Sequence, residues 1–281
     1  LRFVAGFELD SPQARFGGLS DLHVFEDGRI LAISDAGEWL LADIQFDPAS
    51  GLPTSILNAR MALMRDEAGE PFPDKESGDA EDLAIMPDGR VAVSFEQTQT
   101  IRIYDLFGAG PMAPAQAGPP LAGTLRLNRN RGLEALMLVG DALVVGAELG
   151  RRAGPLPIWW VPIHAVEAAP PVSTIRTAPG FALTAWDYDP SRGQVVAVQR
   201  FFAPGIGARI RVMAGASPEG RQALRLEELA LIAAPALVDN VEGVSTQPLP
   251  EGGSRLFLIS DDNFSEEQKT LLYVFDWPAA D

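Results

Sequence analysis

One sequence pattern, repeated along the chain, limits the possible folds more than any other feature. Five segments of seven residues each contain a run of β-branched and aliphatic residues, and all five follow a turn signal such as Asp27-Gly28 or Asp88-Gly89. Apolar runs that follow Gly-containing turns predict the second strand of a β-hairpin. The segments are residues 29–35, 90–96, 142–148, 194–200 and 255–261.

Further strand-like runs flank each repeat. One run precedes the turn, another follows the repeat, and a fourth is present in all repeats but the last. Repeats of four short strands indicate a β-propeller. We therefore predict an all-β, five-bladed propeller that forms one domain over residues 1–281, with the strand Arg2–Leu9 completing the last blade. A six-bladed ring remains the alternative if the loops 65–79 and 107–120 hide a degenerate blade.

Propeller geometry predicts which residues meet. In every blade, the start of the innermost strand and the end of the second strand lie at the same face of the propeller ring, at one mouth of its central channel. The two predicted columns hold seven carboxylates and one basic residue among ten positions. The strand ends are Asp35, Glu96, Glu148, Arg200 and Asp261, and the strand starts are Ser20, Glu81, Glu134, Trp186 and Glu242.

These carboxylates predict a metal site. Acids that crowd together must be protonated, pair with a cation or bind a metal ion. The chain has no Cys and two His, so the ligands are oxygen atoms, which suit Ca²⁺, or alternatively Mg²⁺. The predicted ligands are Asp35, Glu81, Glu96, Glu134, Glu148, Glu242 and Asp261. The structural alternative is that such acids accept hydrogen bonds from the neighbouring blade.

The fourth blade departs from this pattern, because it offers Trp186 and Arg200 where the others offer acids. Arg200, with Arg131 as a second candidate, is suited to hold an anionic group. Trp186 is a candidate apolar wall for a substrate. The alternative is that Arg200 neutralises a neighbouring Glu and Trp186 belongs to the core.

Several segments together resemble the phytase-like domain family, "esterase-like activity of phytase". They are residues 16–39, 79–96, 130–138, 239–248 and 255–277. The resemblance implies a propeller related to the calcium-dependent, six-bladed bacterial phytases, hydrolase chemistry, and a periplasmic or secreted location. It assigns no catalytic residue, so the candidate residues come from the two columns alone.

Two functions fit these observations. One is a calcium-dependent hydrolase of phosphate monoesters or other esters, with Glu148 or Glu96 as general base and Arg200 and Arg131 stabilising developing negative charge. The other is a non-enzymatic periplasmic propeller that binds a metal ion, a small ligand or a partner protein. The net charge of −16 argues against nucleic acid as a partner, and no stretch is apolar enough for membrane insertion. We expect a small anionic substrate, held with the help of a cation.

Overall fold

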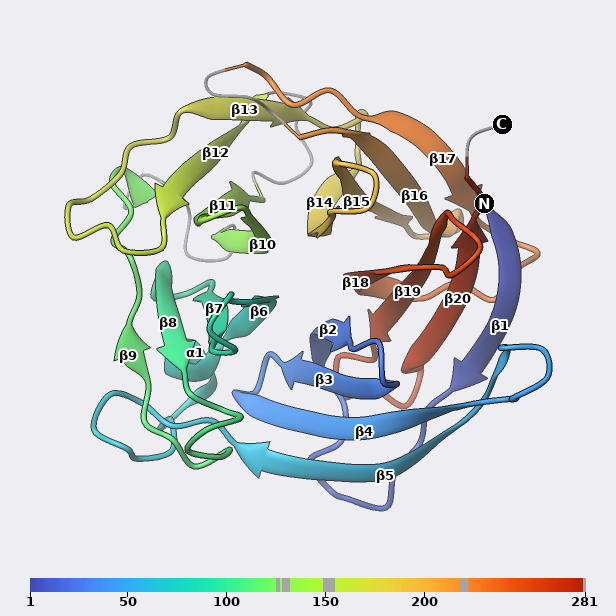
Figure 1. Cartoon of the computed structure of the whole chain (residues 1–281), viewed down its shortest axis with the longest axis horizontal. Coiled ribbons are helices and arrows are strands. Elements are labelled where there is room, and N and C mark those ends of the chain that lie inside the picture. The colour runs from blue at the N-terminus through green and yellow to red at the C-terminus, as the bar shows by residue number, and fades with distance from the viewer. Residues whose placement is uncertain (125–126, 128–131, 149–154, 218–221, 280–281) are drawn as a thin grey trace.

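The strands form five antiparallel sheets of four strands each, arranged as blades around a common axis (Figure 1). The computed structural model describes residues 1–124, 127, 132–148, 155–217 and 222–279. The predicted five-bladed propeller is therefore confirmed. Among the described residues, no helix has the length and apolar character needed to cross a membrane.

Each blade is built from consecutive strands, except the last. The first blade has β2 (Leu19–Val24), β3 (Arg29–Ser34), β4 (Glu38–Phe46) and β5 (Pro53–Leu63). The second has β6 (Ala80–Ile85), β7 (Val91–Phe95), β8 (Thr100–Tyr104) and β9 (Gln116–Ala117). The third has β10 (Leu133–Val139), β11 (Ala142–Ala147), β12 (Pro155–Pro162) and β13 (Ser173–Arg176). The fourth has β14 (Ala182–Asp189), β15 (Gln194–Ala203), β16 (Gly207–Ala216) and β17 (Glu227–Ile232).

The fifth blade joins the two ends of the described chain. It contains β18 (Asn240–Pro248), β19 (Ser254–Asp261) and β20 (Leu271–Trp277), and its outer strand is β1 (Arg2–Glu8). β1 pairs with β20 in antiparallel register, for example Phe7 opposite Leu272. The N-terminal strand thus closes the ring, as the sequence predicted, and covers the edge that β20 would otherwise expose.

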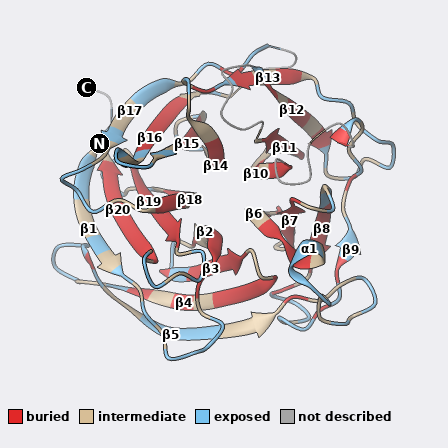
Figure 2. Ribbon diagram, turned by 180° about the vertical axis from the view of Figure 1, so that it is seen from behind, coloured by how far each residue is buried: buried red, intermediate tan, exposed pale blue. Residues whose placement is uncertain are grey.

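The core consists of five apolar clusters, one between each pair of adjacent blades. Alternate residues of β3 show the principle, because Ile30 and Ala32 pack toward the fifth blade while Leu31 and Ile33 pack toward the second. Strands that are buried on both faces are continuously apolar, without polar alternation. Figure 2 shows the result, with buried inner strands and more exposed outer strands such as β5 and β17.

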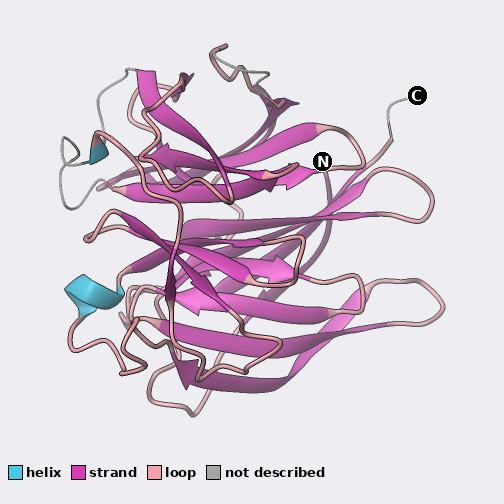
Figure 3. Cartoon of the chain, turned by 60° about the vertical axis from the view of Figure 1, so that its left-hand side comes forward, coloured by secondary structure: helices cyan, strands magenta, loops and turns pink. Residues whose placement is uncertain are grey.

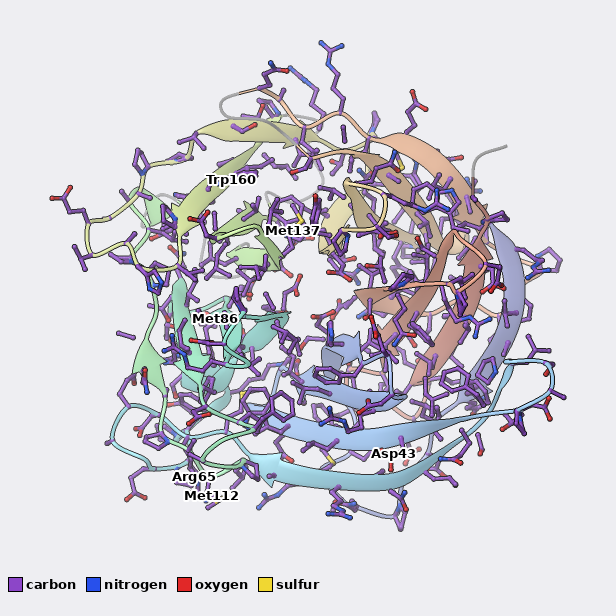
Figure 4. The ribbon with its side chains drawn as sticks, in the orientation of Figure 1. Asp43, Arg65, Met86, Met112, Met137 and Trp160 are labelled. Atoms are coloured by element: carbon purple, nitrogen blue, oxygen red, sulfur yellow. The ribbon has the colours of Figure 1, made fainter. Side chains whose placement is uncertain are left out.

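Hairpin turns and a short helix complete the described fold. The turn between the first two strands of each blade contains a glycine at positive φ, a conformation that other residues adopt only with strain: Gly28, Gly89, Gly140, Gly193 and Gly253. The helical turn α1 (Lys75–Gly78) lies in the loop before β6, at one face of the ring (Figure 3). This loop also reaches the ring's outer edge, where Arg65 Nη2 lies 3.1 Å from Met112 Sδ (Figure 4).

Candidate metal and ligand site

A β-bulge at the start of every innermost strand determines which side chains point away from the apolar packing between the blades. The register shifts after Leu19, Ala80, Leu133, Leu183 and Val241. A bulge adds an unpaired residue and redirects its side chain. The residues that directly follow these shifts are Ser20, Glu81, Glu134, Thr184 and Glu242.

This alignment corrects one residue of the predicted column. The equivalent position in the fourth blade is Thr184, and Trp186 lies two residues further along β14. Trp186 is 1% exposed and belongs to the apolar cluster between the third and fourth blades. It is therefore a core residue and forms no wall of a ligand site.

The two hydroxyl residues in this column connect blades. Ser20 Oγ donates to the carbonyl oxygen of Ala80 at 2.7 Å, and Thr184 Oγ1 donates to that of Val241 at 3.1 Å. Both bonds join a blade to the next one along the chain. The carboxylates of the three glutamates in the column cannot donate such a bond, and these glutamates are the ones that gather with other acids.

The predicted acids do come together. Glu81 interacts electrostatically with Asp35, Glu96 and Glu242, and Glu134 interacts with Glu81, Glu96 and Glu148. Asp261 interacts with Glu242 and Asp35. We call the following set the acidic cluster: Asp35, Asp79, Glu81, Glu96, Glu134, Glu148, Glu242 and Asp261.

Asp79 is the member that the sequence analysis missed. It precedes β6 by one residue, is buried, and its backbone carbonyl accepts a hydrogen bond from Glu96 N at 2.9 Å. Its carboxylate, together with those of Glu81 and Glu96, offers three oxygen atoms that all lie within 4.8 Å of one another. Ca²⁺ binds oxygen at about 2.4 Å, so two of its ligands lie at most about 5 Å apart. The three residues, which we call the carboxylate triad, therefore fit a hard divalent cation.

Burial raises the pKa values of several acids in this cluster. Burial and the nearby carboxylates of Asp79, Glu242 and Glu96 raise the pKa of Glu81 well above its usual range. Burial likewise raises the pKa of Asp79 to about 7, although Lys75 opposes the shift, and the pKa of Asp261 to about 8, with repulsion from Glu242 as a further cause. Without a cation, several of these groups hold protons near neutral pH.

Arg200 is fixed inside the cluster. It is the one basic residue of the two predicted columns, and its Nη1 donates to Asn240 Oδ1. Its Nη2 lies 3.4 Å from Glu242 Oε1, and Asn240 Nδ2 donates to the same carboxylate oxygen at 2.8 Å. Arg200 thus neutralises Glu242, as the structural alternative predicted, and also faces a pocket.

This pocket has a volume of about 600 Å³ and opens between the fourth and fifth blades. Arg200 and Glu148 line it together with Asn240, Asn263 and Gln268. Polar groups of both signs at one concave surface are typical of ligand sites. The pocket and the carboxylate triad meet through Glu134, whose carboxylate interacts with both Glu96 and Glu148.

A second set of acids has a structural role. Asp21 accepts hydrogen bonds from Leu83 N at 3.1 Å and Val244 N at 3.2 Å, so it joins the first blade to both neighbours. Asp82 accepts from Leu136 N at 2.8 Å, and Asp187 accepts from Thr246 N at 2.7 Å. These three acids therefore have the role that the structural alternative predicted, since each accepts a hydrogen bond from a neighbouring blade. None of them is among the ten positions of the two predicted columns.

Arg131 falls outside the described residues. Burial lowers the pKa of His23 to about 4, so its imidazole is neutral at physiological pH, and His23 packs edge-on against Phe25. His164 is exposed beyond the end of β12. Among the described residues, neither histidine belongs to the acidic cluster.

Two solved structures are similar to this chain over nearly its whole length. A structure provisionally named a gluconolactonase is 11% identical with a TM-score of 0.50, over 99% of this chain and 96% of that one. The PQQ-bound aldose sugar dehydrogenase from Streptomyces coelicolor is 12% identical with a TM-score of 0.46, over 98% and 99% of the two chains. No curated protein sequence matches the chain. The family model described as "Phytase-like: Esterase-like activity of phytase" matches residues 14–264, nearly the whole propeller, and the chain belongs to this family.

Proposed function

We propose that the protein hydrolyses small anionic esters, either phosphate monoesters or other esters, at the acidic cluster with a divalent cation, Ca²⁺ or Mg²⁺, as cofactor. The observation that carries the proposal is the carboxylate triad beside a pocket that contains Arg200. The family description supports ester hydrolysis in general terms. The family resemblance also favours a periplasmic or secreted location.

Asp79, Glu81 and Glu96 would hold the cation, with Asp35 nearby as a further ligand. Asp35 Oδ1 is buried without a hydrogen-bond partner, so it has an acceptor position still to be satisfied. When bound, the cation would supply neutralisation of the acids and polarisation of the ester. A protein with a net charge of −16 repels anions unless such a cation or a local arginine is present.

The protein's own residues have distinct tasks in this proposal. Arg200 binds the anionic group of the substrate, and Asn240 holds its guanidinium in position through Oδ1. Glu148 lines the same pocket as Arg200 and takes the proton from the attacking water. Glu96, the other predicted base, belongs to the triad, so Glu148 is the better candidate.

Thermal unfolding tests the cation site first. The protein is stripped with EDTA, checked by elemental analysis, and unfolded with and without added Ca²⁺ or Mg²⁺. An ion that binds only the folded state raises the Tm of the protein. We expect this rise to disappear in Glu81→Gln and to persist in Glu228→Gln, whose side chain pairs with Arg211 on the outer strands. An equal rise in both variants would place the ion elsewhere.

Turnover is then measured with aryl phosphates and aryl carboxylic esters. Glu148→Gln should lose hydrolysis by about 10²-fold or more while it keeps the cation-dependent rise in Tm, because a general base is separate from the ligands. If the cation binds but no substrate is hydrolysed, the result supports the alternative function, a non-enzymatic binding module. Binding should then decline stepwise as ligands are removed.

A further inference from the structure

Lys75 brings a second positive charge to the acidic cluster. It is the first residue of α1, and its Nζ pairs with Asp35 Oδ2 and lies 4.0 Å from Asp79 Oδ1. Asp79 belongs to the carboxylate triad, so the ammonium group reaches a carboxylate that would bind the cation. Figure 2 shows α1 beside β6 and β7, the strands that position the triad.

Backbone contacts hold α1 in place, whereas the lysine side chain is held by its ion pairs with Asp35 and Asp79. Asp74 caps the turn, accepting from Ser77 N at 2.9 Å, and a Cβ atom at Gly78 would lie 3.1 Å from Phe72 Cβ. The glycine at position 37 allows equally close docking, because a Cβ there would lie 3.1 Å from Gly78 O. The side chain of Lys75 is 61% exposed, and a flexible four-carbon stem lets its ammonium group move away.

Arg200 differs in each of these respects. Its guanidinium is bonded to Asn240 and Glu242 and its side chain is 28% exposed. A pair that includes a largely exposed lysine contributes little to stability, so its loss is inexpensive. Of the two cationic side chains that contact the cluster among the described residues, Lys75 is the one that can leave.

We propose that Lys75 is an internal counter-ion that occupies the acidic cluster in the absence of metal and is displaced when a divalent cation binds. Lys75 thereby sets the cation concentration at which the site fills. The inference rests on the cation site of the proposed function and adds a residue that regulates it. A purely structural lysine would pair with Asp35 equally well in the presence of the cation.

The chain allows a direct test because it has only two lysines, Lys75 and Lys269. Lys269 pairs with Glu8 of β1 and serves as an internal control. Reductive methylation with ¹³C-labelled formaldehyde keeps the charge of each lysine and gives each an NMR signal. On addition of Ca²⁺ to the metal-free protein, we expect the Lys75 signal to shift in step with the rise in Tm, and the Lys269 signal to stay in place.

Variants supply the second measurement. Lys75→Gln should lower the half-saturating Ca²⁺ concentration by roughly tenfold, because a competing charge beside the site is removed. Lys75→Arg and Lys269→Gln should leave it unchanged. A wild-type protein that binds Ca²⁺ with an unmoved Lys75 signal, or a Lys75→Gln variant with an unchanged or weaker affinity, would overturn the inference alone. The absence of any Ca²⁺ or Mg²⁺ effect in both the wild type and Lys75→Gln would overturn the cation site itself.

Discussion

Two buried carboxyl groups, Asp21 and Asp82, share a hydrogen bond at the contact between the first two blades. One of them must be protonated for this bond to form. Burial and the adjacent Asp21 raise the pKa of Asp82 well above its usual range, so Asp82 is the donor. Its Oδ2 still accepts from Leu136 N, while its Oδ1 has no other partner. Asp82 therefore acts structurally as a neutral acid.

Asp82→Asn should make stability less dependent on pH. A carboxyl group with a raised pKa in the folded state contributes stability that is complete below its unfolded pKa and declines as the pH rises toward the folded value. Burial raises the pKa of Asp21 to about 7, so the metal-free wild type should lose stability between about pH 4 and 7. Each such proton accounts for about 1.4 kcal/mol per pH unit.

The asparagine amide reproduces the protonated acid, with its oxygen accepting from Leu136 N and its NH₂ donating to Asp21. The free energy of unfolding, measured with urea at pH 5, 6 and 7, should fall less steeply with pH than in the wild type, by about 1.4 kcal/mol per pH unit, the contribution of one proton. Asp21→Asn is the contrasting variant, because both Asp21 oxygens accept from backbone N–H groups and an NH₂ would oppose one of them. An unchanged slope in Asp82→Asn would show that Asp82 carries no proton.

Gly18 is required for the close approach of Asp35 to the start of β2. Its φ is +61°, and a Cβ atom would lie 2.5 Å from Asp35 Oδ1 and 2.4 Å from Phe264 Cε2. Gly18→Ala should reduce the free energy of unfolding by about 2–4 kcal/mol, from backbone strain and this collision. Gly51 has φ +65° with nothing within 4 Å, so Gly51→Ala should lose only about 1 kcal/mol. Equal losses in urea unfolding would contradict the role of the collision.

At the level of strands, the bulges explain which part of the site could be predicted. Glu81, Glu134 and Glu242 were identified because each starts a strand just before a clear apolar run. The sequence predicted Trp186 in place of Thr184. The hairpin of β14 and β15 pairs as far as Asp189 and Gln194, so counting residues back from its turn placed the start of β14 two residues too close to the turn. A bulge and a hairpin length depend on pairing across strands, which local sequence does not show.

β1 closes the ring, and its removal tests how much that closure contributes. Val4, Ala5 and Phe7 pack against the cluster between the fifth and first blades. Deletion of residues 1–9 should reduce the free energy of unfolding by about 3 kcal/mol, because apolar burial is lost, and should lower Tm by roughly 10 °C. The edge of β20 would then be exposed, and the protein should aggregate through it.

A synthetic peptide with the sequence of residues 1–9 should restore Tm in a concentration-dependent manner, because it binds only the folded ring. A peptide of the same composition in scrambled order is the control. Full stability of the truncated protein without peptide would contradict the role of β1 in closure.

For the molecule as a whole, the number of blades could be predicted because each repeat carries its own turn and its own doubly buried strand. The placement of Lys75 and Asp79 could not be predicted in this way. Asp79 aligns with Asn240, which lies one residue before the bulge pair of β18, but no apolar pattern marks either residue. The position of Lys75 depends on α1 docking against Gly37, through a contact between Gly37 and Gly78, which are 41 residues apart in the sequence.

The acidic cluster links cation binding to pH for the whole protein. Burial raises the pKa of Asp79 to about 7, so Asp79 holds a proton at pH 6, and burial with repulsion from neighbouring acids raises the pKa of Glu81 well above its usual range. A cation needs these groups as carboxylates, and its binding must release their protons. The half-saturating Ca²⁺ concentration should therefore fall as the pH rises from 6 to 8, by about tenfold per pH unit for each proton displaced. Titration calorimetry in buffers of different ionisation enthalpy measures the released protons. An affinity that does not change with pH would show that the protonated acids are not the ligands.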